Sequence, residues 1–307
     1  MTKHRKPLLA TAPVSWGVDH IGRPNLPAWQ DVFDEIAKAG FIHTELGPLG
    51  YLPQDPDLIR SEMAKRKLAV CGAALLEPLL DPALEQRSLE AAERLMRLIS
   101  GAGGRFVVIV DWVTPERSAT AGRSDTAVRL TGEPLKHFHA MFEKIGRIAR
   151  RQGVQAVAHP HGGTHLEFED EIDALMAATD PELVGFAIDT GHSAFAGFDA
   201  TPVYERYAAR TSYINFKDCS GSVLDSVRAE KIGFLEAVDR GVFCPLGQGV
   251  VDFAGFVAAM NRNGFDGPAV IEQDRDPTAP GDPTADARSN IAFLKSIGLN
   301  ADTRTTS

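Results

Sequence analysis

The sequence QAVAHPHGG at residues 155–163 opens the stretch that decides the fold. After a helical pattern comes VGFAIDTGH at residues 184–192, and after a second helical pattern comes SYINFKD at residues 212–218. Short apolar runs of strand length thus alternate with amphipathic segments of helical length, which is the pattern of parallel β–α–β units. Each of the three runs ends in polar residues that can bind a metal or carry a proton.

The same alternation extends along the chain in both directions and predicts eight strands and eight main helices. The predicted strands cover residues 8–15, 41–46, 68–75, 106–110, 155–159, 184–189, 212–217 and 269–272. The predicted helices cover residues 29–39, 56–66, 83–98, 135–151, 169–178, 202–209, 253–263 and 285–297. Gly40, Gly153, Gly264 and Gly298 follow four of the helices, as expected of left-handed C-caps.

Eight strands favour a closed barrel of the α/β class, a (β/α)8 TIM barrel. We expect one domain at residues 1–299 and a polar tail at residues 300–307 that frays. An open, doubly wound sheet has the same alternation, but no glycine-rich nucleotide loop follows the first strand, which ends in PVSWG at residues 13–17. Two long connections, at residues 112–134 and 219–251, are expected at the mouth where barrel enzymes build pockets.

Composition excludes several classes of function. The net charge of −9 argues against a surface that binds nucleic acid, because such binding depends on clustered Lys and Arg. The three cysteines show no CxxC spacing, and the sequence contains neither a secretory signal pattern nor an apolar run long enough to span a membrane. We therefore expect a cytoplasmic protein whose partner is a small polyol or keto-sugar, with no nucleic-acid or membrane partner.

Polar side chains gather where the predicted strands end. These ends read Thr44-Glu45, His159-Pro160-His161, Asp189-Thr190-Gly191-His192, Asn215-Phe216-Lys217-Asp218 and Glu272-Gln273-Asp274. Any one of them is more often a helix cap or a turn former, in roughly two cases of three. Together they would bury charge at one mouth unless something pairs with it, and a metal ion is the economical partner. Imidazole with carboxylate suits Mn²⁺, Co²⁺, Fe²⁺, Ni²⁺ or Zn²⁺.

Other residues are weighed against ordinary structural roles. His159 and His161 point the same way only if the strand continues through Pro160. If it does not, only one of them is a metal ligand and the other is free for proton transfer. Trp16 is equally well interpreted as core filler or as an aromatic platform for a sugar ring. Four further histidines are interpreted as surface or packing residues, and His165 is left open. Those four are His4, His43, His137 and His139.

The motifs resemble the xylose isomerase-like superfamily of sugar isomerases and epimerases, over about residues 8–298. The resemblance is carried by APVSWG at residues 12–17, TELG at 44–47 and DTGH at 189–192. NFKD at 215–218, GFLEAV at 233–238 and PLGQGVVDF at 245–253 narrow it to the inosose dehydratase family, which removes water from 2-keto-myo-inositol. The resemblance thus implies a TIM barrel enzyme of inositol catabolism, often a homodimer or homotetramer in this group.

The resemblance also implies a set of metal ligands. Members of the superfamily hold a metal with Glu, Asp, His and Glu from the ends of strands five to eight. Asp189 and Glu272 match the second and the fourth of these. His159 stands in place of the first Glu, and Asn215 in place of the His, which binds a metal more strongly than an amide does. We take these four as the metal positions, with His161 as the substitute ligand.

The expected activity is that of a metal-dependent lyase acting on inosose. Mn²⁺ or Co²⁺ is the preferred metal, with Zn²⁺, Fe²⁺, Ni²⁺ or Mg²⁺ as alternatives. His161, Glu45 and Lys217 are the catalytic candidates for proton transfer and oxyanion stabilisation. The candidates for binding substrate hydroxyl groups are Trp16, His192 and Gln273.

Three other functions are also compatible with the sequence. A ketose isomerase or epimerase would use the same metal site, and a keto-glycoside β-eliminase would need a wider mouth near residues 219–251. A non-catalytic sugar-binding barrel is the third. A barrel endonuclease is disfavoured by the acidic charge.

Overall fold

Eight parallel strands close into a barrel in the computed structural model, which describes residues 6–303. The order around the barrel is β1-β10-β7-β6-β5-β4-β3-β2, so that β1 pairs with both β2 and β10 and closes the ring. Its strands are β1 (Leu8–Thr11), β2 (His43–Glu45), β3 (Ala69–Glu77), β4 (Phe106–Asp111), β5 (Gln155–Ala158), β6 (Val184–Asp189), β7 (Thr211–Phe216) and β10 (Pro268–Ile271). The predicted TIM barrel is confirmed.

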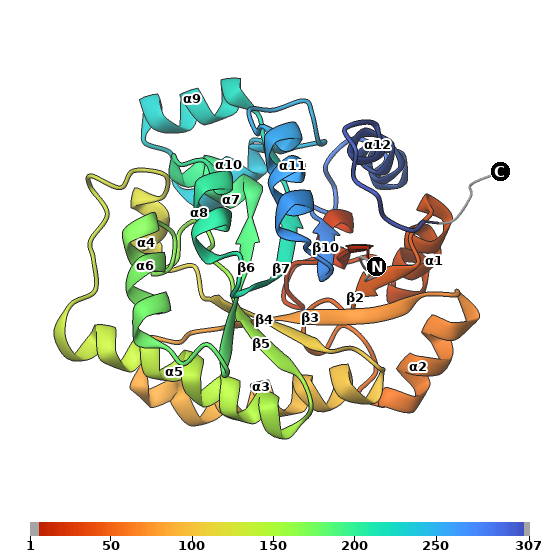
Figure 1. Ribbon diagram of the computed structural model, residues 1–307, viewed down its shortest axis with the longest axis horizontal. Coiled ribbons are helices and arrows are strands. Elements are labelled where there is room, and N and C mark those ends of the chain that lie inside the picture. The colour runs from red at the N-terminus through yellow and green to blue at the C-terminus, as the bar shows by residue number, and fades with distance from the viewer. Residues whose placement is uncertain (1–5, 304–307) are drawn as a thin grey trace.

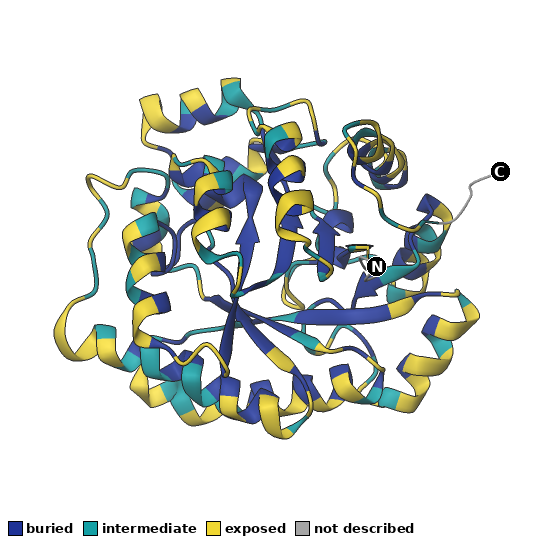
Figure 2. Ribbon diagram, in the orientation of Figure 1, coloured by how far each residue is buried: buried dark blue, intermediate teal, exposed yellow. Residues whose placement is uncertain are grey.

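Eight main helices surround the strands (Figure 1). They are α1 (Trp29–Ala39), α2 (Pro56–Lys65), α3 (Glu85–Gly101), α5 (Gly132–Arg151), α6 (Glu169–Ala178), α8 (Ala200–Tyr207), α11 (Phe253–Asn263) and α12 (Pro283–Ser296). The predicted helices agree with these to within three residues at each end. Figure 2 shows the strands buried and the outer helix faces exposed, as the amphipathic patterns require. No helix among residues 6–303 is long and apolar enough to cross a membrane.

The first strand is shorter than predicted. It ends at Thr11, and Pro13–Trp16 form a 3-10 turn, η1, that is closed by Gly17 at φ 82°. Pro13 lacks the N–H that a continuing strand needs for its ladder, and it fits the first position of a helical turn. A second 3-10 turn, η2 (Pro82–Leu84), precedes α3. The predicted His4 lies outside the described residues, as do residues 304–307 of the expected tail.

The two long connections contain short elements that the sequence patterns did not reveal. The first holds α4 (Pro115–Thr120), and the second holds α9 (Gly221–Glu230), α10 (Phe234–Asp239) and the small antiparallel sheet of β8 (Asp218–Cys219) and β9 (Phe243–Cys244). A further short helix, α7 (Thr190–Ala196), starts directly after β6. Together these elements bury an apolar cluster of their own at one end of the barrel. We call α4, α9, α10, β8 and β9 the cap.

Asp218 fixes the connection that follows the cap. Its carboxylate accepts hydrogen bonds from four backbone N–H groups, at 2.9 to 3.1 Å. The donors are Cys219, Gly247, Gly249 and Val251. This cradle explains the PLGQGVV motif, because a Cβ at Gly249 would overlap both the Asp218 carboxylate and the Cys219 carbonyl. The same hydrogen-bonded cradle fixes the backbone next to Lys217, a residue of the functional site described below.

Gly249→Ala tests the packing of this cradle. The backbone there is not left-handed, so the added methyl acts only through overlap and lost hydrogen bonds. We expect the free energy of unfolding to fall by about 3 kcal/mol, measured by urea denaturation. Gly22→Ala, in an exposed turn where only the His20 ring lies near, is the control and should change the value little. Equal stability of the two variants would contradict the proposed packing.

Candidate functional site

The carboxyl ends of β6, β7 and β10 converge on one buried ammonium group, that of Lys217. Its Nζ lies 3.4 Å from Asp189 Oδ2, 3.3 Å from Glu272 Oε2 and 2.9 Å from Asp274 Oδ1. It also lies 3.0 Å from Nε2 of His192. Asp189 and Glu272 therefore face a common centre, and they come from strands that the sequence analysis predicted to meet at one mouth. Only 1% of the Lys217 side chain is exposed.

Three buried polar atoms beside this centre have no hydrogen-bond partner among the described residues. They are Nδ1 of His159, Oδ2 of Asp189 and Oδ1 of Asn215, at the ends of three adjacent strands. Buried polar atoms are rarely left without a partner, because the loss of hydration costs about 1–3 kcal/mol each. Ligand atoms of His159, Asp189 and His192 also lie within 4.8 Å of one another. A divalent metal ion fits this donor set of imidazole, carboxylate and amide oxygen.

Three imidazole rings lie against one another in tilted and edge-on arrangements, two directly after β5 and one in the first turn of α7. The His161 and His192 ring centroids are 3.9 Å apart, and His159 lies 5.6 Å from His192. β5 ends at Ala158, so the two histidines are not related by strand alternation, and both rings nevertheless reach the cluster. Cap residues Phe234 and Phe243 pack on the rings of His161 and His192 respectively, at 5.0 and 5.1 Å. Aromatic side chains of the cap thus cover two of the three histidine rings.

Burial controls the charge of these groups. It lowers the pKa of His161 to about 4 and holds that of His192 well below its usual value, so both rings are neutral at pH 7. Burial also raises the pKa of Asp189, to about 6, although Lys217 opposes this shift. For Lys217, burial alone would lower the pKa, but the three neighbouring carboxylates outweigh it and raise the pKa. The raised pKa favours the protonated form of Lys217, which suits it to stabilise an oxyanion rather than to remove a proton.

Glu45 reaches the same region from β2. Its carboxyl accepts a hydrogen bond of 2.6 Å from the hydroxyl of Tyr213, and only 2% of the residue is exposed. Burial raises the pKa of Glu45 to about 7, against the opposing effects of Tyr213 and of the Lys217 charge. A carboxyl group with this pKa exchanges protons readily near neutral pH.

Two residues that the sequence analysis predicted to bind substrate form their hydrogen bonds with residues outside the Lys217 cluster. The Trp16 side chain is 95% buried, and its indole N–H donates to Glu35 Oε2 on α1 at 2.7 Å, so it packs in the core and is not an open platform. Gln273 follows Glu272 but bonds through its backbone to Ser15 and through its amide to the Phe243 carbonyl. The expected role of each in substrate binding stays a prediction.

The structure also places four other histidines that the sequence analysis considered, His43, His137, His139 and His165. His137 and His139 are on α5, and His43 is in β2. His165, which the sequence left open, bonds to Asp111 at the end of β4, through its ring at 3.1 Å and through its backbone at 3.2 Å. This pair joins the loops after β4 and β5.

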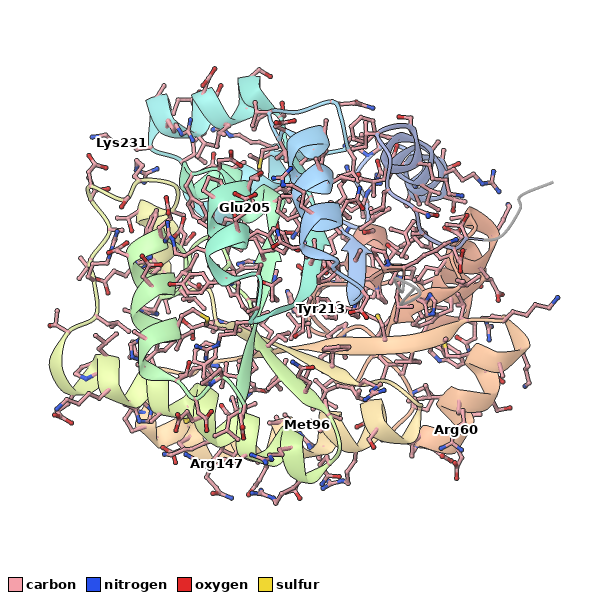
Figure 3. All side chains as sticks on the ribbon, viewed as in Figure 1. Arg60, Met96, Arg147, Glu205, Tyr213 and Lys231 are labelled. Carbon is pink, nitrogen blue, oxygen red and sulfur yellow. The ribbon has the colours of Figure 1, made fainter. Side chains whose placement is uncertain are left out.

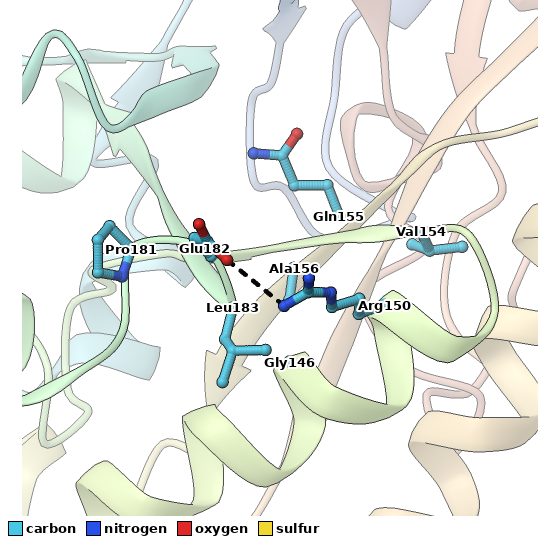
Figure 4. Close-up of a pocket in the computed structure, with 8 residues that line it drawn as sticks. All are labelled: Gly146, Arg150, Val154, Gln155, Ala156, Pro181, Glu182 and Leu183. Carbon is cyan, nitrogen blue, oxygen red and sulfur yellow. Dashed lines mark ion pairs between the residues drawn. The ribbon is translucent and has the colours of Figure 1, made fainter.

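A hollow at the opposite end of the barrel carries no comparable cluster. Figure 4 shows it at the N-terminal ends of β5 and β6, beside the last turns of α5. Its one drawn ion pair, between Arg150 and Glu182, is 3.6 Å long and exposed. Catalytic groups of TIM barrels lie at the carboxyl ends of the strands, so the Lys217 cluster is the candidate site.

A model of the xylose isomerase-like TIM barrel family matches residues 33–297 of this chain. The chain belongs to this family. It is 30% identical over 285 residues to an inosose dehydratase of Geobacillus thermodenitrificans, a match that covers 90% of this chain and 93% of the relative. An inosose dehydratase of Lacticaseibacillus casei is also 30% identical, over 88% of this chain and 90% of the relative. The resemblance inferred from the sequence motifs is confirmed, and the chain is an enzyme.

Solved structures of more distant proteins have the same fold. The probable 3-DHS dehydratase AsbF of Bacillus anthracis matches with a TM-score of 0.72 at 13% identity, over 94% of this chain and 98% of AsbF. The IolI protein, whose structure contains a zinc atom, matches with a TM-score of 0.70 at 15% identity, over 94% of this chain and 97% of IolI. At these identities the likeness concerns the fold alone.

Sequence reasoning assigned no role in the site to four residues that contribute to it. Asp274 contacts Lys217 directly, and its signal was present, because it belongs to the polar run that ends β10. Phe234 and Phe243 pack on the histidines from the cap, and no local pattern marks an aromatic residue for that role. Tyr213 was hidden inside an apolar strand, where a tyrosine is usually core.

A buried ion network holds the loop that carries His161. Arg117 of α4, only 1% exposed, pairs with Glu171 at 2.8 Å and with Glu167 at 3.6 Å. Glu167 accepts the backbone N–H groups of Gly122 at 2.7 Å and Gly163 at 3.1 Å. The network therefore joins the first cap connection to the turn directly after His161.

The pH dependence of stability tests the network. Burial raises the pKa of Glu167 from 4.5 to about 7, against its hydrogen bonds and Arg117. The folded chain therefore binds this proton more tightly than the unfolded chain, and the associated stability is lost as the pH rises from about 4.5 through 7. The loss is on the order of 2–3 kcal/mol. In Glu167→Gln this part of the slope should be missing from urea unfolding measured between pH 4.5 and 8.

Glu116→Gln, on the exposed side of α4, is the control and should keep the wild-type slope. A Glu167→Gln slope equal to that of the wild type would show that Glu167 does not change its proton affinity on folding.

Proposed function

We propose that this enzyme is a divalent-metal-dependent dehydratase that removes water from a keto-inositol, with inosose as the first substrate to test. The observation that carries the proposal is the group of ligand atoms of His159, Asp189 and His192 within 4.8 Å of one another, next to Asn215 Oδ1 and the Lys217 ammonium. Such a set suits a cation and an oxygen-rich substrate. The names of the two relatives supply the substrate class.

The metal would be held by His159, Asp189, Asn215 and Glu272, with His161 as a substitute ligand. The mixed nitrogen and oxygen donors favour Mn²⁺ or Co²⁺, while Zn²⁺, Fe²⁺, Ni²⁺ and Mg²⁺ remain alternatives. When bound, such a metal polarises the ketone and the adjacent hydroxyl as a Lewis acid.

The chain's own residues carry the proton transfers. A base, His161 or Glu45, takes the proton from the carbon next to the ketone, and the C–H electron pair forms the enolate. Lys217 stabilises the negative charge on the enolate oxygen, because its ammonium stays protonated. The enolate electrons then expel the β-hydroxyl group, which leaves as water with a proton from the other of the two groups. Burial lowers the pKa of His161 to about 4 and raises that of Glu45 to about 7, so His161 as base with a protonated Glu45 as acid fits these charge states, whereas the reverse assignment needs a protonated His161.

The cap favours a small substrate over a keto-glycoside. Phe234 packs on His161, and Gly162 has no room for a Cβ because the Phe234 ring would lie 2.6 Å from it. The connection 219–251 therefore contributes packing against the site, whereas a β-eliminase acting on glycosides needs a wide mouth there.

An epimerase or isomerase is the second candidate. Its first step is the same proton removal, and it differs only in returning the proton to another face or carbon. The presence of two proton carriers, Glu45 and His161, is the observation that favours it. The cytoplasmic location and the homodimer or homotetramer expected from the sequence stay predictions.

Removal of a carboxylate ligand tests the metal centre. Asp189→Ala and Glu272→Ala should each lower the bound Mn²⁺ or Co²⁺ at least tenfold by elemental analysis after dialysis, since charged ligands dominate binding to hard cations. Both should remain folded by circular dichroism. Glu93→Ala, on the exposed face of α3, should keep the wild-type metal content. Full occupancy in both site variants would refute the assignment.

Substrate tests separate the two activities. Metal-supplemented enzyme is offered inosose, other ketoses and 3-keto-glycosides in deuterated water. We expect inosose to give an enone or dione product that absorbs in the ultraviolet, because water is lost after proton removal. Deuterium uptake seen by NMR without water loss would instead indicate an epimerase or isomerase. Absence of both signals with every substrate would refute the proposed activity on keto-polyols.

A further inference from the structure

The barrel interior beneath the site is filled by one large polar side chain, that of Tyr213. Its neighbours in the interior cluster are mostly small, among them Ala10, Ala12 and Ala187. Tyr213 is fully buried, and Phe106 packs edge-on against its ring at 5.5 Å. Figure 3 labels it close to the centre of the ring of strands. Its ring therefore has little freedom to move, and its hydroxyl is held at one place.

The Tyr213 hydroxyl meets one carboxyl oxygen. It donates to Oε1 of Glu45 at 2.6 Å and lies 3.6 Å from the sulfur of Cys71. Cys71 in turn donates to the Thr44 carbonyl at 3.3 Å. Among the described residues, Glu45 Oε2 has no hydrogen bond, so the second oxygen is left for a substrate. The tyrosine thus binds one edge of the carboxyl group and leaves the other edge to react.

The backbone of β2 is irregular at the same residue. The register between β2 and β3 shifts between Thr44 and Glu45, where Glu45 pairs with Gly72. Such an irregularity re-aims the side chain that follows it and is frequent next to active sites. At Gly72 a Cβ would overlap the Phe106 carbonyl, so this glycine lets the strands approach. A bulge and a hydrogen bond therefore act on the orientation of one carboxyl group.

We propose that Tyr213 is a positioning residue that holds Glu45 as the proton-transferring carboxyl group, within electrostatic reach of Lys217. The inference rests on the proposed function, which does not itself assign a role to Tyr213. Buried carboxyl groups that carry protons lose rate steeply when misplaced, by up to about 100-fold for 1 Å. The tyrosine supplies the constraint that a flexible glutamate side chain lacks.

Tyr213→Phe removes only the hydroxyl and keeps the ring. We expect kcat for inosose to fall about 10- to 100-fold, with KM changed less than about threefold, because the group acts on proton transfer and not on substrate binding. Tyr207→Phe is the matched control, since its hydroxyl also donates to a carboxylate at 2.6 Å, that of Asp173 outside the barrel. The control should keep the wild-type kcat. Equal effects of the two variants would overturn the inference.

A double-mutant cycle tests the route of the effect. In a Glu45→Gln background, Tyr213→Phe should cause no further loss of kcat, because the tyrosine acts through Glu45. Independent, multiplicative losses would overturn the inference. Glu45→Asp, which keeps the carboxyl group but shortens its reach, should lose nearly as much as Glu45→Gln. Near-wild-type turnover by Glu45→Asp would show that position does not matter.

Infrared spectroscopy gives a readout that does not depend on turnover. In protein labelled with ¹³C-carboxyl glutamate, the band lost in Glu45→Gln identifies Glu45, and Tyr213→Phe should shift this band while Tyr207→Phe should not. An unshifted band would overturn the inference. Tyr213→Phe could also shift the band while the wild-type enzyme turns over no keto-polyol. That result would refute the proposed function and leave the contact between Tyr213 and Glu45 established.

Discussion

The structure depends on keeping the ammonium group of Lys217 in a nearly dry barrel mouth. An unpaired charge at such a depth would cost several kcal/mol, and three carboxylates from two strand ends compensate it. This requirement explains the surrounding architecture. The strands must end at the same level so that the carboxylates meet. The cradle around Asp218 must fix the backbone next to Lys217. The cap must exclude water so that the charges act strongly on a substrate.

Excess acidity distinguishes this cluster from a simple ion pair. Asp189, Glu272 and Asp274 outnumber the single lysine, and burial raises the pKa of Glu272 well above its usual value. The site is therefore short of positive charge, and the unpartnered atoms of His159 and Asn215 lie beside it. A divalent ion would correct both deficits at once, which is why donor chemistry and electrostatics favour the same proposal.

Most of the fold could be predicted from the sequence, because each strand and each main helix has its own local periodicity. The strand-end residues could also be predicted as a group, since a parallel barrel brings carboxyl ends together whatever the details. Their partners could not. The contact between Tyr213 and Glu45 joins residues 168 positions apart, and it occurs next to a register shift in β2 that no local pattern encodes. The cap helices escaped prediction because they are short and are stabilised by contact with one another and with the site.

Asp189 performs two tasks with its two oxygens. Oδ1 accepts the backbone N–H of His192 and so caps α7, while Oδ2 faces the cluster. Asparagine would keep the cap but lose the charge, and glutamate would keep the charge but reach past the cap. Substitution by asparagine is therefore disfavoured by the chemistry of the site, and substitution by glutamate is disfavoured by the folding of α7. Selection for the cap alone would also admit asparagine, and selection for the charge alone would also admit glutamate, so only the two requirements together preserve aspartate.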